Sequence, residues 1–191
     1  AKMAKPGLLI AVDARDYRLE LAREFGADLG MKVTTEDAVQ KVKDLKPEAV
    51  FVFVPAGEQP AAIMKTFGER GLSGAGMKIL GTMEITDDAA MQSMGDAALG
   101  IITSAHYGHE HKTKMNPDFV KAFTAESGGD LPTFMAVGGY DGMAAIYETV
   151  KKVSGPIDGD KAIAVLKSLK LESPRGEFSI DPQARDIDQT I

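Results

Sequence analysis

Short apolar runs alternate with amphipathic segments through the first half of the chain. Runs with strand character stand at residues 8–12 (LLIAV), 31–35 (MKVTT), 49–54 (AVFVFV), 78–83 (KILGTM) and 99–107 (LGIITSAHY). A continuous apolar run such as 49–54 is typical of a parallel strand that is covered on both faces. The segments between the runs repeat their apolar residues at helical spacing. This order predicts a doubly wound parallel sheet with flanking helices over residues 8–107.

The pattern changes after Tyr107. A polar connection (GHEHKTKMNP) is followed by helical patterns around 117–126, 139–153 and 159–169, with almost no strand signal between them. The Pro and Gly residues around EFSI, near the end of the chain, predict an extended, hairpin-like tail. We therefore expect an α/β region, then a helical segment, then a short extended tail.

Composition narrows the class of protein. With 44% hydrophobic and 26% charged residues, the chain resembles ordinary soluble globular proteins. The net charge of −6, without any block of Lys or Arg, argues against a nucleic-acid partner. The absence of cysteine excludes disulfides, thiol catalysis and thiolate metal sites. The apolar runs are too short to span a bilayer, and the start AKMAKPG lacks the apolar region of a signal peptide.

Polar side chains follow four of the expected strands. The strand ends fall at residues 13–17, 55–58, 82–84 and 105–107, and these turns carry Tyr, Glu and His. Ligands of open α/β sheets bind beyond the carboxyl ends of the strands. Each turn taken alone is better explained as a capped, solvated loop. As a set on one sheet edge, the turns are a reasonable polar lining for a small-molecule cleft.

The three histidines are clustered in one loop. His106, His109 and His111 lie within six residues, with Glu110 between the last two. The loop lacks the i, i+4 helical spacing of a zinc HExxH motif, so a solvent-facing loop is favoured over a metal site. We find no nucleotide-binding glycine loop, nucleophile elbow or Cys–His pair. We therefore expect neither a cofactor nor a catalytic centre.

Four segments carry a resemblance to a known family. They are KPEAVFVFVPAGEQ, GLSGAGMKILGTMEITDDAAMQSMGDAALGIITSAHY, NPDFVKAFTAESGGDLPTFMAVGGYDGMAAIYE and LESPRGEFSIDPQARDIDQTI, in order between residues 46 and 191. Together they resemble the type I periplasmic solute-binding proteins of the branched-chain amino acid ABC-transporter group. The resemblance implies two flavodoxin-like lobes, joined by a hinge of crossing strands, that close on a small carboxylate-bearing ligand.

The resemblance also implies a division of the chain and a set of ligand contacts. Residues 1–107 and 171–191 would form the second, ligand-binding α/β lobe, and the helical segment 108–170 would pack on a first lobe that is not present in this chain. Glu84 is the nearest match to the acidic residue that meets a ligand ammonium in the family, offset by about one position. The implied ligand-binding residues are Tyr17, Ala56, Gly57, Glu58, Gln59, Met83, Glu84, His106 and Tyr107.

The implied function is that of a non-catalytic receptor. It would be the periplasmic substrate-binding component of an ABC transporter, would bind a small organic acid, amino-acid-like or aromatic, and would deliver it to a membrane permease. Met83 favours a ligand with an apolar body, because methionine packs adaptably around irregular shapes. If the first lobe is absent, we expect another chain to cover the apolar helix face, which would make the protein an oligomer.

One segment departs from this family. Residues 9–45, with DARDYRLELAREFGAD, resemble a βα unit of zinc-type alcohol dehydrogenases, in which Asp13 would meet an adenosine ribose. The glycine loop that must precede such a strand is absent. Two alternatives to a solute receptor remain: a fragment of an NAD(P)-dependent oxidoreductase, and a truncated or chimeric α/β scaffold without a ligand.

Overall fold

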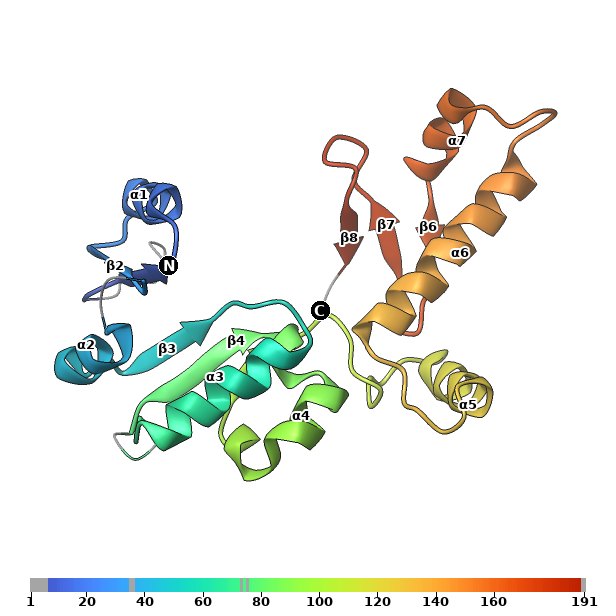
Figure 1. The fold of residues 1–191 in the computed structure, drawn as a ribbon. Helices are drawn as coiled ribbons and strands as arrows, with labels where there is room; N and C mark the ends of the chain where they lie inside the picture. The colour runs from blue at the N-terminus through green and yellow to red at the C-terminus, as the bar shows by residue number, and fades with distance from the viewer. Residues whose placement is uncertain (1–6, 35–36, 73, 75, 190–191) are drawn as a thin grey trace. The chain divides into compact units, whose positions relative to one another are not determined.

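The chain divides into an α/β unit and a second unit of helices with a small sheet. A computed structural model describes residues 7–34, 37–72, 74 and 76–189 (Figure 1). The first unit ends at Ile102, and the second runs over Thr103–Ile191. The boundary falls inside the strand Ile102–Ser104. The first unit therefore contains most of the α/β repeats, and the second contains the helical segment and the tail. Among the described residues, no helix is both long and apolar enough to cross a membrane.

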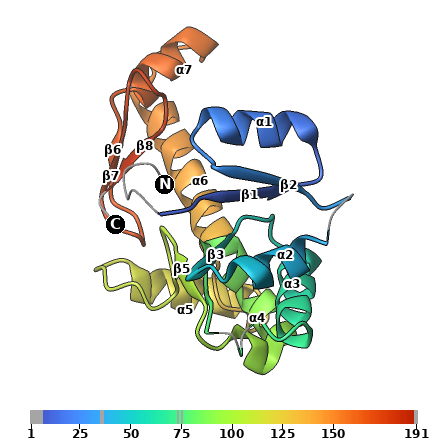
Figure 2. The same ribbon diagram turned by 90° about the vertical axis from the view of Figure 1, so that its left-hand side faces the viewer.

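The first unit begins with a βαβ unit whose two strands are parallel. Strand β1 (Ile10–Asp13) is followed by helix α1 (Asp16–Glu24) and strand β2 (Leu29–Lys32). β1 and β2 pair in parallel, with Ile10 opposite Leu29. Figure 2 shows α1 lying over this pair, and the buried side chains of Leu19 and Met31 form its core.

A second, larger α/β layer follows. Its elements are α2 (Ala38–Leu45), β3 (Ala49–Val52), α3 (Glu58–Glu69), β4 (Lys78–Thr82), the 3-10 helix η3 (Met83–Thr86), α4 (Asp88–Met94), the 3-10 helix η4 (Gly95–Ala98) and β5 (Ile102–Ser104). The strands form a sheet in the order β3-β4-β5, with β3 parallel to β4. Helix α3 lies across the β3–β4 pair (Figure 1). The core joins Val52 and Ile79 of the sheet to Met64 and Phe67 of α3.

The α/β class and the parallel pairing are confirmed, but the sheet differs from expectation in two ways. The strands belong to two sheets, β1-β2 and β3-β4-β5, rather than to one. In addition, β3 is buried on one face only: Val52 is 7% exposed, whereas Phe51 and Phe53 are 64% and 75% exposed. Successive side chains of a strand point to opposite faces, and in this chain the helical core covers only the face that carries Val52.

The second unit is helical with a closing sheet. Its helices are α5 (Asn116–Glu126), α6 (Phe134–Lys152) and α7 (Gly159–Leu166), and its strands are β6 (Lys170–Leu171), β7 (Phe178–Ile180) and β8 (Ile187–Gln189). The three strands are antiparallel in the order β6-β7-β8, which confirms the extended, hairpin-like tail.

Helix α6 begins earlier than its sequence pattern predicts. We expected helix from about residue 139, within VGGYDGM, but the helix starts at Phe134 and includes both Gly138 and Gly139. Thr133 caps it, because the Thr133 side chain accepts a hydrogen bond from the amide of Met135. The cap and the complete burial of Val137 offset the low helix propensity of glycine.

An apolar face of α6 is exposed in this chain. Met143, Ile146, Tyr147 and Val150 are each 45–58% exposed. They follow one another at helical spacing and so form a continuous stripe. The structure thus contains the large apolar surface that the sequence predicts for this segment. The assignment of 108–170 to contacts with a first lobe, and of 171–191 to the ligand-binding lobe, stays a prediction.

Candidate functional site

Two of the predicted ligand turns lie at the same edge of one sheet. Ala56 and Gly57 lie in the loop after β3, Glu58 and Gln59 begin α3, and Met83 and Glu84 follow β4. Because β3 and β4 are parallel, with Val52 opposite Gly81, their carboxyl ends meet at one edge. Gly81 makes this edge tight, since a Cβ at that position would lie 2.9 Å from the Val52 carbonyl oxygen and would collide with Ile85. Ile85 can therefore pack against β4 and hold η3 at the strand end.

The turn after β4 contains two polar atoms without partners. The hydroxyl Oγ1 of Thr82 and the carboxyl Oε2 of Glu84 are buried, and neither has a hydrogen-bond partner within the described part of the chain. An unsatisfied buried polar group costs about 1–3 kcal/mol, and more when it is charged. Such groups are rare in folded proteins and call for a ligand, water or ion. The Thr82–Glu84 pair is therefore the strongest polar feature of this edge.

Sequence reasoning included Thr82 in the turn but not among the ligand-binding residues. The available signal was its position as the last residue of an apolar strand, directly before Met83. A hydroxyl at a strand end also serves as an ordinary helix cap, and here Thr82 makes no side-chain cap bond to η3. Only the structure distinguishes the two roles, because burial of Oγ1 depends on the packing of residues around the turn.

The turn after β3 is open. Ala56, Gly57, Glu58 and Gln59 are all exposed. Gly57 has φ +120° and ψ −140°, a conformation that residues other than glycine rarely adopt. Apart from Gly57 and its two chain neighbours, no atom of the described residues lies within 4 Å of the place where a Cβ would stand, so the backbone of this turn is accessible to a ligand or to another part of a protein.

Tyr17 lies on α1, the helix between β1 and β2. Its phenol oxygen accepts a hydrogen bond from Arg18 Nε at 3.1 Å. This hydrogen bond lowers the pKa of Tyr17 below its usual range. Arg18 also contacts the Asp13 carboxylate at 3.4 Å. The amide of Arg15 donates to Asp13 at 2.8 Å and is the main cause of the lowered pKa of that carboxyl. Asp13 is thus engaged within its own loop.

His106 and Tyr107 belong to the second unit. Tyr107 is only 4% exposed, and its hydroxyl donates to Asn116 Oδ1 at 2.8 Å. Burial raises the pKa of Tyr107 to about 12. The Tyr107 ring packs edge-on against Phe119, with centroids 6.2 Å apart. The His106 ring packs edge-on against Phe134, with centroids 5.9 Å apart. The turn is therefore well ordered by its neighbours.

The histidine loop lies beside this turn. His109, Glu110 and His111 line an open pocket together with Asn116 and Val120. Among the described residues, no group of three or more His, Cys, Asp or Glu side chains could hold a metal ion.

The different environments of Tyr17 and Tyr107 predict separate alkaline titrations. We expect the Tyr17 phenol to ionise before an ordinary tyrosine, and the Tyr107 phenol to ionise last, near pH 12. Because the folded-state pKa of Tyr107 is raised, its contribution to stability is complete below pH 10, the usual tyrosine value. That contribution is lost as the pH rises toward 12. A spectrophotometric phenolate titration of Tyr17→Phe and Tyr107→Phe tests this. Loss of the same transition in both variants would contradict it.

The candidate turns are divided between the two units. Tyr17, the 56–59 turn, Met83 and Glu84 belong to the first unit, and His106 and Tyr107 to the second. The shared edge of the turns after β3 and β4 follows from the strand register. The convergence of all four turns on one ligand stays a prediction.

Comparison with known proteins shows a consistent set of relatives. A family model described as periplasmic binding protein matches residues 14–191. The Leu/Ile/Val-binding protein homolog 6 of Brucella melitensis biotype 1 is 33% identical over 165 residues, which are 84% of this chain and 42% of that protein. The chain therefore spans less than half the length of this curated relative.

Solved structures give the same picture. A solute-binding protein of an ABC transporter from Rhodopseudomonas palustris BisB5, in complex with 3,4-dihydroxybenzoic acid, is 43% identical, with a TM-score of 0.76. The similarity covers 98% of this chain and 56% of that one. A solute-binding protein from R. palustris in complex with 4-hydroxybenzoate is 31% identical, with a TM-score of 0.77, over 95% of this chain and 54% of that one.

These matches bear on the segment that resembles a dehydrogenase. The family model begins at residue 14 and so includes almost all of residues 9–45. The structural similarity to the BisB5 protein likewise covers 98% of the chain. The solute-binding interpretation is therefore favoured over the oxidoreductase alternative, and the engagement of Asp13 by Arg15 and Arg18 is consistent with this.

Proposed function

The chain belongs to the periplasmic binding protein family, and on this premise we propose that it is the second lobe of a solute receptor that serves an ABC transporter. The receptor binds a small organic acid between two lobes and delivers it to a permease in the membrane. It performs no chemistry on the ligand, and it works in the bacterial periplasm. Closure of the lobes around a largely desolvated ligand supplies much of the binding energy.

The observation that carries this proposal is the unsatisfied pair at the end of β4. Oγ1 of Thr82 and Oε2 of Glu84 are buried without partners among the residues that the structure describes. A ligand hydroxyl or ammonium that donates to the Glu84 carboxyl group would satisfy the more costly of the two. The Thr82 hydroxyl can donate or accept, so it can bind the same ligand group.

We favour a hydroxylated aromatic acid as the ligand. Such a molecule combines a carboxylate with a phenolic donor, which suits the Glu84 carboxyl. The relative that is 43% identical was solved with 3,4-dihydroxybenzoic acid, and the similarity of the chains supports the same ligand class here. Met83, beside Glu84, provides an adaptable apolar contact for a ring. The second candidate is an α-amino acid, which the name of the Brucella relative favours and whose ammonium group would meet Glu84.

The rest of the cleft would come from a first lobe. The chain covers 56% of the BisB5 protein, which leaves room for a lobe of the same kind. The exposed stripe of α6, formed by Met143, Ile146, Tyr147 and Val150, is the surface that we propose packs on it. In this arrangement residues 108–170 support the first lobe, and the ligand contacts come from the turns of residues 1–107.

Ligand-dependent thermal unfolding tests the proposed function. We expect 3,4-dihydroxybenzoate and 4-hydroxybenzoate to raise the melting temperature of the two-lobed receptor in a saturable way, since a ligand that binds only the native state stabilises it. Benzoate, which lacks the donor, is expected to act more weakly, and a nicotinamide dinucleotide not at all. Stabilisation by the dinucleotide that Asp13→Ala abolishes would establish the oxidoreductase alternative instead. If leucine stabilises and the hydroxybenzoates do not, the amino-acid candidate is correct.

A further inference from the structure

A continuous network of polar contacts runs through the second unit. It begins at Asn116, the first residue of α5, which is 2% exposed. The Asn116 side chain accepts from the Tyr107 hydroxyl and donates to the backbone carbonyls of His109 and His111, each at 2.8 Å. One amide group therefore uses both donor hydrogens and its acceptor oxygen to hold the loop between Tyr107 and α5.

The network continues from this loop to a second turn. The Thr113 hydroxyl accepts a hydrogen bond from the backbone N–H of Asn116 at 3.2 Å and donates one to the Pro174 carbonyl at 2.6 Å. These residues are 61 positions apart in the sequence. The contact therefore joins the segment after β5 to the segment between β6 and β7, which are the places where the chain leaves and re-enters the α/β lobe in the proposed two-lobed arrangement.

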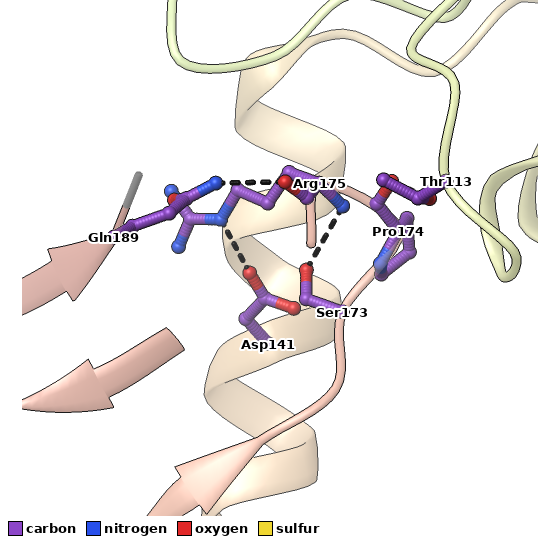
Figure 3. A network of polar contacts seen from close by, with 6 residues as sticks. All are labelled: Thr113, Asp141, Ser173, Pro174, Arg175 and Gln189. Atoms are coloured by element: carbon purple, nitrogen blue, oxygen red, sulfur yellow. Dashed lines mark hydrogen bonds and ion pairs between the residues drawn. The ribbon is translucent and has the colours of Figure 1, made fainter. Parts of the chain in front are cut away.

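Arg175, in the second turn, makes three polar contacts, which Figure 3 shows. Arg175 Nε lies 2.7 Å from Asp141 Oδ2 on α6, and both side chains are buried. The Arg175 amide donates to Ser173 Oγ at 3.2 Å. Gln189 of β8 donates to the Arg175 carbonyl at 2.8 Å. These contacts fix the position of Arg175 and of the neighbouring Pro174, whose carbonyl accepts the hydrogen bond from Thr113.

We propose that Asn116 is the positioning residue of the His106–Tyr107 turn and that the Thr113–Pro174 contact anchors it to the Arg175–Asp141 pair. Asn116 acts through Tyr107 and does not touch the ligand. A turn held in one conformation before binding loses less conformational entropy when the ligand arrives. The expected effect of replacing Asn116 on ligand affinity rests on the proposed function, whereas its expected effect on the conformation of the loop between Tyr107 and α5 does not.

Hydrogen exchange measures the effect on the loop. The amides of His111 and Thr113 are hydrogen-bonded to Gly108 and His111 carbonyls, so their exchange reports opening of the loop. In Asn116→Ala we expect both amides to exchange faster by roughly tenfold, the equivalent of about 1.4 kcal/mol. Tyr107→Phe, which removes only the hydroxyl and keeps the ring, is expected to act in the same direction with a smaller effect.

A matched control separates positioning from general destabilisation. Thr149→Ala removes another buried hydroxyl of the same unit, which donates to the Ala145 carbonyl at 2.8 Å on α6. We expect this variant to lower the melting temperature and to leave the His111 and Thr113 amides unchanged. If Thr149→Ala accelerates these amides as much as Asn116→Ala does, the loop opens only by global unfolding and the proposal is wrong.

Ligand affinity tests the second half of the proposal. With 3,4-dihydroxybenzoate as the probe and the two-lobed receptor as the protein, we expect Asn116→Ala to weaken binding roughly tenfold and Thr149→Ala to leave it unchanged. The effects of Tyr107→Phe and Asn116→Ala should be non-additive, because both remove the same contact. Unchanged affinity in Asn116→Ala, with the wild type binding, overturns the positioning role. If the wild type binds none of the acids, the proposed function fails and hydrogen exchange alone decides the role of Asn116.

Discussion

Asp141→Ala is expected to destabilise the second unit by roughly 3–5 kcal/mol, the usual loss when one partner of a buried ion pair is removed. The side chains of Arg175 and Asp141 are 7% and 3% exposed, and their N–O distance is 2.7 Å. Removing the carboxylate leaves a guanidinium buried without its counter-charge. Chemical denaturation of the wild type and the variant measures the difference in the free energy of unfolding.

A second ion pair in the same unit is the natural control. Lys170 and Glu177 also approach to 2.7 Å, but their side chains are 65% and 51% exposed. Glu177→Ala is expected to have only a small fraction of the effect of Asp141→Ala, because solvent screens an exposed pair. Equal effects of the two variants would show that burial does not determine the strength of the Arg175–Asp141 pair.

The apolar double variant Asp141→Leu with Arg175→Met distinguishes the cost of an unpaired charge from the value of the pair. Replacing a buried ion pair with hydrophobic residues is often neutral or stabilising. Asp141 Oδ1 has no hydrogen-bond partner in the described part of the chain, so the native pair is incompletely satisfied. We therefore expect the double variant to recover most of the stability that Asp141→Ala loses. The double variant also removes the Arg175–Asp141 pair, however, so we expect its Thr113 amide to exchange faster than that of the wild type.

Glu84→Gln is expected to change affinity and stability in opposite directions. A hydrogen bond to a charged group contributes about 1.5–3 kcal/mol, so we expect the affinity for 4-hydroxybenzoate to fall on the order of 10- to 100-fold. The affinity for benzoate, which has no phenolic donor, should change little. In the ligand-free protein the variant should be as stable as the wild type or more stable, because Oε2 of Glu84 is buried without a partner among the described residues.

Calorimetric titration and thermal unfolding together test this expectation. Glu69→Gln is the matched control: Glu69 is exposed at the end of α3 and interacts with Lys65 at 3.9 Å. We expect this substitution to leave both affinity and stability unchanged. Thr82→Val, which removes the neighbouring hydroxyl, should follow Glu84→Gln with a smaller loss of affinity. A Glu84→Gln protein that is less stable and binds normally would assign Glu84 to folding and not to the ligand.

Local pattern predicted the type and order of most elements, but not the short strand β6 or the full course of residues 99–107, of which only Ile102–Ser104 form a strand. The run AVFVFV predicted β3. The spacing of apolar residues predicted a helix after it, where α3 lies, and a helix around 117–126, close to the observed bounds of α5. These predictions succeed because backbone periodicity is a local property: a strand repeats every two residues and a helix every 3.6. The ends were less accurate. α6 begins at Phe134, five residues before its predicted start, since a threonine cap and the burial of Val137 outweigh two glycines.

The candidate site was predictable only as a set of positions. The crevice rule and the family resemblance indicated Met83 and Glu84 at a strand end, and the structure places both directly after β4. The two unsatisfied atoms there were not predictable, because whether a hydroxyl or a carboxyl oxygen finds a partner depends on residues from several elements. The same is true of Tyr107, whose hydroxyl is directed to Asn116 by the course of the loop between them.

The sequence by itself determined the α/β class, the parallel pairing, the antiparallel tail and the family, since each depends on local periodicity or on the order of motifs along the chain. The tertiary structure decided which side chains are buried and which polar groups meet. Phe51 and Val52 are both apolar neighbours in one strand, yet only Val52 is covered. Asp141 and Arg175 are 34 positions apart, and only the packing of α6 against the turn before β7 makes them a buried pair. Long-range contact is a property of the folded chain, so no local pattern contains it.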